Sequence, residues 1–290
     1  MSTVLPKLLI FGGDGQLGRA LLAQTSAFSC NAYGRAHADI TDFDQLSYLC
    51  DTHEPDVVIN AAAYTDVDAA EQNADTAFLI NRTGAGNVAR AARGAALVHI
   101  STNFVFDGTK EAPYRPYDTP NPLSVYGLSK QAGEAQVLQF HDHCMVLRAS
   151  ALFYEHGQNF VATMLRLAQA KKTLRVIDDQ YAQPTYAGHL ADAILHCLPM
   201  ILAQKGQHIA HYADQPACSW YDFARAIFKT CPQPWSCQPI PSSDYPAPAQ
   251  RPPNGVLDIQ DFCAAFDTVQ KSWQAGLDAY HAGMAQGGSR

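Results

Sequence analysis

Near its start the chain carries the run Leu8-Leu9-Ile10-Phe11-Gly12-Gly13-Asp14-Gly15-Gln16-Leu17-Gly18, followed by a helix-forming segment, Arg19 to Gln24. The apolar residues are typical of a strand buried on both faces. Gly12, Gly15 and Gly18 then separate this strand from the helix, which is the context of a dinucleotide-binding loop. Such glycines let the backbone approach a pyrophosphate, whose charge the helix N-terminus favours. Because the spacing is Gly-x-x-Gly-x-x-Gly, a tight turn that binds nothing is the alternative.

Strand-like and helix-like segments alternate beyond this loop. Strands are expected at Cys30–Tyr33, Pro55–Asn60, Ala96–Ile100 and Cys144–Arg148, and helices at Phe43–His53 and Asn81–Arg93. This alternation predicts an α/β fold with a Rossmann-type, doubly wound parallel sheet. The pattern changes at Ala151, so we predict a nucleotide-binding domain over residues 1–150. A smaller, mainly substrate-binding α/β domain is predicted over residues 151–290.

Composition limits the classes of function. The chain has 290 residues, of which 47% are hydrophobic, and a formal net charge of −7, enough for one large domain or two coupled ones. No basic cluster indicates nucleic-acid or membrane-surface binding. No run reaches the ~18–20 apolar residues of a membrane span, and no signal peptide is recognised at the start. A soluble cytoplasmic protein is therefore expected.

The cysteines and histidines do not predict a metal site. Eight cysteines are scattered without a Cys-x-x-Cys pair, and the long apolar segments make a disulfide framework unnecessary. His141, His143 and Cys144 are close enough in sequence to bind a metal. They straddle a helix end and the next strand, where alternation would turn the ligands apart, so we predict none.

A second decisive stretch is Tyr126-Gly127-Leu128-Ser129-Lys130. A tyrosine and a lysine four residues apart share one face of a helix, with Cβ atoms about 5–6 Å apart. The ammonium is expected to lower the pKa of the phenol, which could then donate a proton to a carbonyl oxygen. The preceding strand-like segment His99–Phe106 brings a hydroxyl, Thr102. A chance Tyr-x-x-x-Lys is common, but with a dinucleotide loop these groups predict a ketone reductase.

Further residues are candidates for the cofactor site. Arg35 follows the second expected strand, where an acidic residue would accept the ribose hydroxyls of NAD and an arginine would pair with a 2′-phosphate. Arg35 therefore favours NADPH over NADH, with an exposed arginine as the alternative. Asp39 could reach the adenine, or be a solvated carboxylate. Small residues from Ala61 leave room for a cofactor at the sheet edge, and Asn81 is a further candidate.

The segment from Pro232 to Pro253 is rich in proline and lacks periodicity. We expect no regular structure there, and a loop of that length in a compact protein is either disordered or functional. Arg251, beside Pro252 and Pro253, is predicted to lie on a rigid arm that presents a guanidinium to an anionic ligand.

Taken together, these motifs resemble the dTDP-4-dehydrorhamnose reductase family of the extended short-chain dehydrogenase/reductase superfamily. The similarity runs almost end to end and rests on the glycine loop, Asn60–Asp68, Ser101-Thr102, Asn121–Gly127, Asp179–Thr185 and Arg251–Asn254. It implies reduction of the C4 ketone of a dTDP-6-deoxy-4-ketohexose with NADPH or NADH. It also implies a homodimer, leaves Mg²⁺ open as a second cofactor, and implies that about residues 172–200 return to the nucleotide domain.

The resemblance assigns roles residue by residue. Tyr126 is the proton donor, Lys130 tunes it and binds ribose, and Thr102 holds the ketone oxygen. Gly15, Gln16 and Leu17 contact the pyrophosphate, Asp39 and Ile40 the adenosine side, and Ala63, Tyr64 and Thr65 line the nicotinamide approach. The further candidates for cofactor binding are Gly12, Gly18, Arg35, Ala61, Ala62 and Asn81. The substrate candidates are Thr102, Asn103, Ala151, Asn159, Gln183 and Arg251.

Three departures from the family pattern affect the substrate. Asn103 replaces an aspartate, Phe104 a tyrosine, and Ala151 a tryptophan that packs near the sugar. The smaller Ala151 either opens space for a different or larger hexose or weakens binding of the usual one. A reductase of a different nucleotide-linked ketosugar is therefore the first alternative. A non-catalytic NADP-binding regulator is the second, and retention of Thr102, Tyr126 and Lys130 argues against it. A dehydratase would need a carboxylate pair beside Thr102, which Asn103 and Phe104 do not supply.

Overall fold

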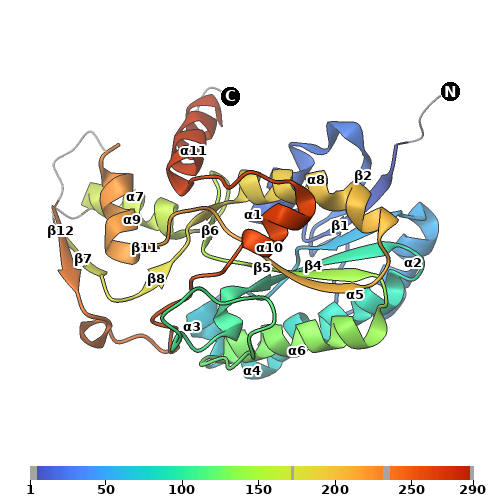
Figure 1. Ribbon diagram of the computed structural model, residues 1–290, viewed down its shortest axis with the longest axis horizontal. Helices are drawn as coiled ribbons and strands as arrows, with labels where there is room; N and C mark the ends of the chain where they lie inside the picture. Colours follow the sequence, from blue (N-terminus) through green and yellow to red (C-terminus); the bar gives the residue numbers. More distant parts are fainter. Residues whose placement is uncertain (1–4, 171–172, 231–235, 288–290) are drawn as a thin grey trace.

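A six-stranded, wholly parallel sheet forms the centre of the molecule (Figure 1). The computed structural model describes residues 5–170, 173–230 and 236–287. The strand order is β10-β5-β4-β3-β1-β2. The strands are β1 Lys7–Phe11, β2 Ser29–Tyr33, β3 Val57–Asn60, β4 Ala96–Thr102, β5 Cys144–Ala149 and β10 Gln207–Tyr212. The predicted Rossmann-type doubly wound sheet is confirmed, and its order reverses between β1 and β3, where ligands bind in such folds.

Helices cover both faces of the sheet because its strands are apolar on both sides. One face packs against α1 (Gln16–Leu22) and α8 (Ala187–Ala203), with Ile10 and Val98 in the shared core. The other face packs against α2 (Phe43–His53), α5 (Ala85–Ala91) and α6 (Val125–Phe140). In the part of the chain that the structure describes, no helix combines the length and apolar character needed to cross a membrane.

The glycine loop lies against the end of β3. Gly12 has φ +87°, and a Cβ there would lie 2.6 Å from the Ala62 amide nitrogen and 2.7 Å from the Ala61 carbonyl carbon. No side chain fits at that distance, so glycine is required for the backbones to approach. Two segments that the sequence predicts to bind the cofactor are thereby placed in contact.

The start of α6 is fixed closely against the end of β4. Ser124 caps the helix by accepting a hydrogen bond from the Gly127 amide at 3.2 Å, as short polar residues do at this position. A Cβ on Gly127 would lie 2.3 Å from the Phe104 carbonyl oxygen. Gly127 therefore lets the helix that carries Tyr126 approach the turn after Thr102.

A second group of elements lies at one end of the sheet, on the left in Figure 1. It includes α7 Phe160–Ala170, β7 Thr173–Ile177, α9 Trp220–Phe228, β12 Ser236–Ile240 and α11 Trp273–Gly287. The expectation that Pro232 to Pro253 lacks regular structure is wrong for β12, which pairs in parallel with β7. This two-stranded sheet leaves one edge of β12 unpaired, so Pro239, which has no N–H, is tolerated. Residues 232–235 lie outside the described residues.

The chain returns to the main sheet over a segment that overlaps residues 172–200 and extends past them. Helix α8 packs against α1, and β10, which follows it, pairs with β5. Strand β7 also lies inside that range, and among the described residues it pairs only with β12. The division into two domains at residue 150 stays a prediction.

Candidate active site

Thr102, Tyr126 and Lys130 come together where β4 ends beside the first turns of α6. Thr102 closes β4, and its hydroxyl accepts a hydrogen bond from the Phe104 amide at 3.2 Å. Lys130 Nζ donates to the Ile100 carbonyl at 2.6 Å. Tyr126 interacts with the Thr102 side chain and packs edge-on against the Phe104 ring, 5.6 Å between centroids. Hydroxyl, phenol and ammonium therefore occupy one place at the carboxyl edge of the sheet.

The electrostatics of Tyr126 differ from the expectation. Burial raises the pKa of Tyr126 above its ordinary value, and interaction with the Thr102 side chain only partly opposes this. The predicted lowering by Lys130 is wrong here, because the ammonium is directed to the Ile100 carbonyl. The phenol consequently stays protonated at neutral pH, which is the form a proton donor requires.

Lys130 is almost fully buried, with 2% of its surface exposed. Burial lowers the pKa of Lys130 to about 8, against the opposing effect of the Glu134 charge. An ammonium carries three hydrogens, and the bond to Ile100 uses one of them. Lys130 therefore retains donors for the hydroxyl groups of a ligand.

Asn81 joins the segment after β3 to α6. The expected helix Asn81–Arg93 begins with a π-helical turn, Leu79–Gly84, and α5 ends at Ala91. The Asn81 amide accepts from the Tyr64 N–H at 2.8 Å and donates to the Tyr64 carbonyl at 3.0 Å and to Ser129 Oγ at 2.9 Å. Asn81 therefore makes these bonds from within a π-helical turn, a feature often found at functional sites.

The adenosine-side candidates lie beyond β2. The Arg35 side chain is 79% exposed, and its Nε is 3.6 Å from the Asp39 carboxylate. Asp39 accepts hydrogen bonds from the amide and hydroxyl of Thr41, and the amide bond is the main reason that the pKa of Asp39 is lowered. Ile40 is buried. Binding of the cofactor by these residues stays a prediction.

Two substrate candidates bind the chain's own backbone. The buried Gln183 amide donates to the Leu257 carbonyl at 3.0 Å and accepts from its N–H at 2.8 Å. Asn103 Nδ2 donates to the Gly255 carbonyl at 3.0 Å. Both side chains therefore hold the segment 255–257 beside the site, and their contact with a substrate stays a prediction.

Arg251 has a carboxylate partner within the chain. Its guanidinium donates to Asp68 through Nη1 at 3.0 Å and Nη2 at 2.8 Å, and hydrogen bonding to Arg251 lowers the pKa of Asp68. Asp68 belongs to α3 (Val67–Ala70), directly after the Ala61–Thr65 segment. An anionic ligand at Arg251 would have to share the guanidinium with Asp68.

Ala151 and Asn159 lie beyond β5. Ala151 has φ 44°, a left-handed conformation that is uncommon for residues other than glycine and that clusters at functional sites. Its carbonyl accepts from the Thr185 amide at 3.1 Å. Asn159 donates to Gln16 Oε1 at 2.9 Å, which links a substrate candidate to the glycine loop.

Among the described residues, no group of three histidine, cysteine, aspartate or glutamate side chains is placed to hold a metal, so Mg²⁺ gains no support. His141 Nε2 lies 3.2 Å from the Ala92 carbonyl, and His143 Nε2 lies 2.7 Å from the Ile201 carbonyl. Each ring is therefore held by a backbone carbonyl.

Sequence reasoning missed four polar residues around the site. Ser129 bonds Asn81 and the Tyr126 carbonyl, and Asp68 holds Arg251. Glu134 and Arg148 form a buried ion pair with Nη2 and Oε2 2.7 Å apart. Only Glu134 carried a usable signal, since it follows Lys130 by four residues and must share its helix face.

Comparisons with known proteins agree with this geometry. The sequence profile described as RmlD substrate binding domain matches residues 6–285. A dTDP-4-dehydrorhamnose reductase of Aggregatibacter actinomycetemcomitans is 38% identical, over 94% of this chain and 97% of its own. The Salmonella typhimurium protein of the same name is 35% identical, over 93% of this chain and 95% of its own. The crystal structure of the Bacillus anthracis dTDP-4-dehydrorhamnose reductase in complex with NADP superposes on this structure with a TM-score of 0.91. The two sequences are 32% identical, and the match covers 96% of this chain and 99% of the other.

These matches span nearly the full length of each protein, and each of the two sequence relatives is more than one third identical to this chain. The matched region includes the glycine loop, the end of β4 and the Tyr126–Lys130 turn of α6. The chain therefore belongs to the RmlD substrate binding domain family.

Proposed function

We propose that this protein reduces the C4 ketone of dTDP-4-dehydro-6-deoxy-L-mannose (dTDP-6-deoxy-L-lyxo-4-hexulose) to dTDP-L-rhamnose, with NADPH as the preferred cofactor. The observation that carries the proposal is that Thr102, Tyr126 and Lys130 lie together at the carboxyl edge of the sheet. The glycine loop lies at the same edge. The names of the relatives support the substrate, and the NADP complex of the Bacillus anthracis protein supports the cofactor. The resemblance also supports a cytoplasmic homodimer.

The residues divide the reaction between them. The reduced nicotinamide, when bound, supplies a hydride for the carbonyl carbon. Negative charge then develops on the ketone oxygen, where the Tyr126 phenol gives up its proton and the Thr102 hydroxyl orients the same atom. The Lys130 ammonium is directed to the Ile100 carbonyl, so its proposed part in the reaction is to bind the cofactor.

Residues along the carboxyl edge fit an extended dinucleotide. The loop from Gly12 to Gly18 would hold the pyrophosphate, and Arg35 with the Asp39-Ile40 segment the adenosine. Ala61 to Tyr64 remain only partly buried after β3, so their backbone is accessible to the nicotinamide. Lys130 would bind the ribose hydroxyls through its remaining donors.

Isotope transfer tests the reaction. NADPH carrying deuterium at its transferable position is incubated with the protein and the 4-keto sugar, and the product is analysed by NMR. Deuterium at C4 of dTDP-L-rhamnose is expected. Label in solvent, or a product with an unreduced C4, would contradict the proposal.

Arg35 should discriminate between the two cofactors. Arg35→Ala is expected to weaken NADPH binding by about 1.5–3 kcal/mol more than NADH binding, because a charge-assisted pair with the 2′-phosphate is lost. Dissociation constants from fluorescence titration measure the difference. Arg93→Ala, an exposed arginine elsewhere, serves as the control and should change neither constant. Equal weakening of both cofactors in Arg35→Ala would remove Arg35 from the 2′-phosphate site.

The pH dependence of kcat/KM should follow the protonation state of Lys130. Because the pKa of Lys130 is about 8, its charge is lost as pH rises through that value, whereas Tyr126 stays protonated. We expect kcat/KM for NADPH, which reports the free enzyme, to fall above about pH 8. A profile that stays flat to the ordinary tyrosine range of about 10 would contradict the assignment.

Ala151 favours a second candidate, a reductase of another nucleotide-linked 4-ketosugar. It lies two residues after Ala149, which pairs with Thr102 across the sheet. Its methyl group stands where the family pattern has the large ring of a tryptophan. A panel of nucleotide-linked 4-ketosugars ranked by kcat/KM decides between the two. The rhamnose precursor should rank first, and a preference of tenfold or more for a bulkier sugar, about 1.4 kcal/mol, would establish the alternative.

A further inference from the structure

Glu134 is a buried carboxylate on the same face of α6 as Lys130. It has 4% of its surface exposed, and residues four apart on a helix are neighbours. Three donors converge on it: Ser101 Oγ at 2.5 Å and Arg148 Nε at 2.9 Å reach Oε1, and Arg148 Nη2 at 2.7 Å reaches Oε2. A carboxylate with these charge-assisted hydrogen bonds is held in one position.

The same stretch of β4 binds both helix residues. Ile100 accepts from Lys130, and its neighbour Ser101 donates to Glu134. Thr102, the hydroxyl of the proposed site, comes next along the strand. Two contacts one helical turn apart therefore fix how α6 lies on β4, and with it the position of Tyr126 relative to Thr102.

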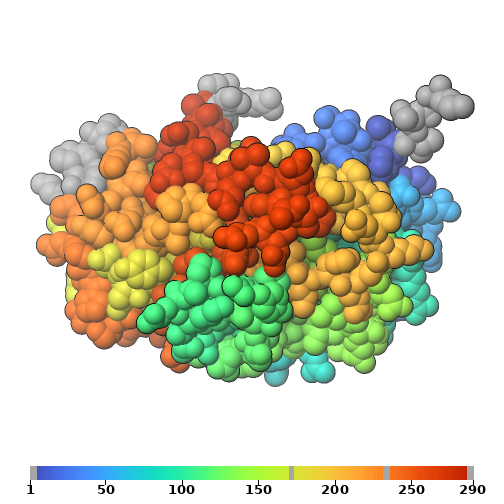
Figure 2. All heavy atoms as spheres, in the orientation of Figure 1, coloured from blue at the N-terminus to red at the C-terminus, as the bar shows by residue number. Residues whose placement is uncertain are grey.

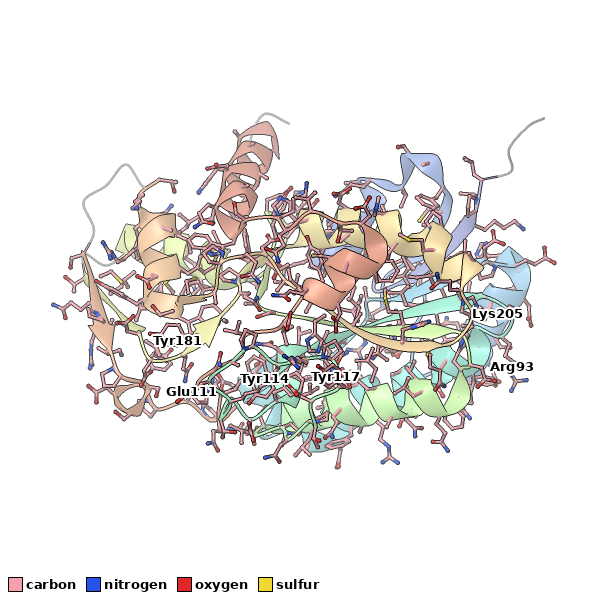
Figure 3. All side chains as sticks on the ribbon, viewed as in Figure 1. Arg93, Glu111, Tyr114, Tyr117, Tyr181 and Lys205 are labelled. Carbon is pink, nitrogen blue, oxygen red and sulfur yellow. The ribbon has the colours of Figure 1, made fainter. Side chains whose placement is uncertain are left out.

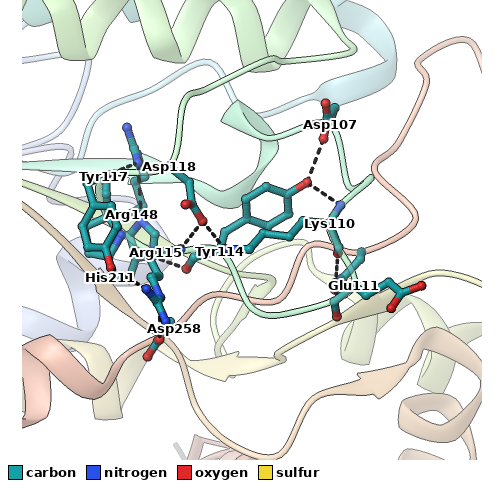
Figure 4. Close-up of polar contacts among 12 residues, drawn as sticks. Asp107, Lys110, Glu111, Tyr114, Arg115, Tyr117, Asp118, Arg148, His211 and Asp258 are labelled. Atoms are coloured by element: carbon teal, nitrogen blue, oxygen red, sulfur yellow. Dashed lines mark hydrogen bonds and ion pairs between the residues drawn. The ribbon is translucent and has the colours of Figure 1, made fainter.

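Arg148 extends the arrangement to the loop between β4 and α6 (Figure 4). It pairs with Ser101 across the sheet, and its Nη1 donates to the Pro116 carbonyl at 3.1 Å and lies 3.4 Å from His211 Nε2. His211 Nδ1 lies 3.1 Å from the Tyr114 carbonyl. A neutral ring that donates from Nδ1 and accepts at Nε2 satisfies both contacts, and burial together with Arg148 lowers the pKa of His211 to about 3.

The loop that Arg148 holds also contacts the C-terminal segment. The Tyr114 N–H donates to the Val256 carbonyl at 2.8 Å, and the Asp258 N–H donates to the Tyr114 carbonyl at 2.7 Å. Figure 2 shows the green loop and the orange-red chain side by side on one face, and Figure 3 labels Glu111, Tyr114 and Tyr117 along the loop. The ion pair thus lies beneath the segment that connects Thr102 to Tyr126.

Stability alone does not account for a charged pair at this place. Replacing a buried ion pair by apolar side chains of similar size is often neutral or stabilising. What an apolar pair could not supply is a negative charge one helical turn from Lys130. Resting on the proposed function, we propose that Glu134, held by Arg148 and Ser101, is a positioning residue that fixes how α6 lies on β4 and places a negative charge one helical turn from Lys130.

Several titratable groups surround Lys130 and bear on this assignment. Tyr126 and Glu134 belong to α6, His99 to β4 and Arg148 to β5. His99 is fully buried, and burial together with the Lys130 charge lowers its pKa, so it is neutral. Glu134 is the group whose charge opposes loss of the Lys130 proton.

The test measures the Lys130 proton directly. Protein labelled with ¹³C at lysine Cε is titrated by NMR, with Lys130→Met assigning the signal. In Glu134→Gln, the midpoint for Lys130 should fall by about one pH unit, and the alkaline limb of kcat/KM should move with it. Because the NMR midpoint needs no turnover, it decides the role of Glu134 even if the protein reduces no sugar, a result that would overturn the proposed function separately.

Control variants separate charge from packing. Ser101→Ala removes one bond to the carboxylate, and Glu134→Asp keeps the charge, so both should leave the midpoint near that of the unmodified protein. If Glu134→Gln does not fold, the double variant Glu134→Gln/Arg148→Met removes the pair without stranding a charge, and the downward shift should persist. An unchanged midpoint in the folded neutral variant would overturn the proposal.

Discussion

Tyr126→Phe should lower kcat by roughly 10²- to 10⁴-fold, the usual contribution of a positioned acid. The ring and its edge-on packing with Phe104 are kept, while the proton that reaches the ketone oxygen is removed. The dissociation constant for NADPH should change little, because only one hydroxyl is lost. Steady-state kinetics and fluorescence titration measure the two quantities.

Tyr48→Phe is the matched control, since this tyrosine is 69% exposed on α2 and far along the chain from the site. Its kcat should equal that of the unmodified protein. Near-normal turnover in Tyr126→Phe would refute the donor role. A parallel loss of NADPH affinity would instead mean that the phenol mainly binds the cofactor.

Arg148→Met should destabilise the fold by about 3–5 kcal/mol, because Glu134 is left as a buried charge without its partner. A carboxylate in that position can lose its charge by taking up a proton. The destabilisation should therefore shrink as pH falls and be largest at neutral and alkaline pH. The free energy of unfolding, measured with urea at several pH values, gives the result.

Two comparisons make this measurement specific. Arg166→Met replaces an exposed arginine on α7 and should change the free energy of unfolding by less than about 0.5 kcal/mol. Glu134→Gln/Arg148→Met should recover much of the lost stability. A pH-independent loss of about 1 kcal/mol in Arg148→Met, typical of an ordinary substitution, would show that the pair is not desolvated as the structure has it.

The parallel sheet could be predicted because strands covered by helices on both faces must be apolar throughout. The runs that became β1, β3 and β5 had that character. Strand β12 could not be recognised, since it pairs with β7 alone, is largely exposed and contains Pro239. The hydrogen bonds of Asn81 were equally hidden, because they join it to Tyr64 and Ser129, which are distant in sequence.

The same limit applied to the site residues: those related by local spacing could be predicted, and those brought together by tertiary contacts could not. Tyr126 and Lys130 are related by local helix spacing, which the sequence displays. Arg148 contacts Glu134 only because of the register of β5 on β4 and the packing of α6 against these strands. The expected effect of Lys130 on Tyr126 was wrong for a related reason, since the spacing does not reveal that the Ile100 carbonyl binds the ammonium.

The most direct measurement of the central claim is NADPH oxidation, followed by the absorbance of the reduced nicotinamide, with dTDP-6-deoxy-L-lyxo-4-hexulose generated in situ. Oxidation that depends on the sugar and is lost in Tyr126→Phe is expected. Tight binding of NADPH without sugar-dependent oxidation would contradict the claim. Other 4-ketosugars would then test the specificity suggested by Ala151, and their failure would leave the non-catalytic reading.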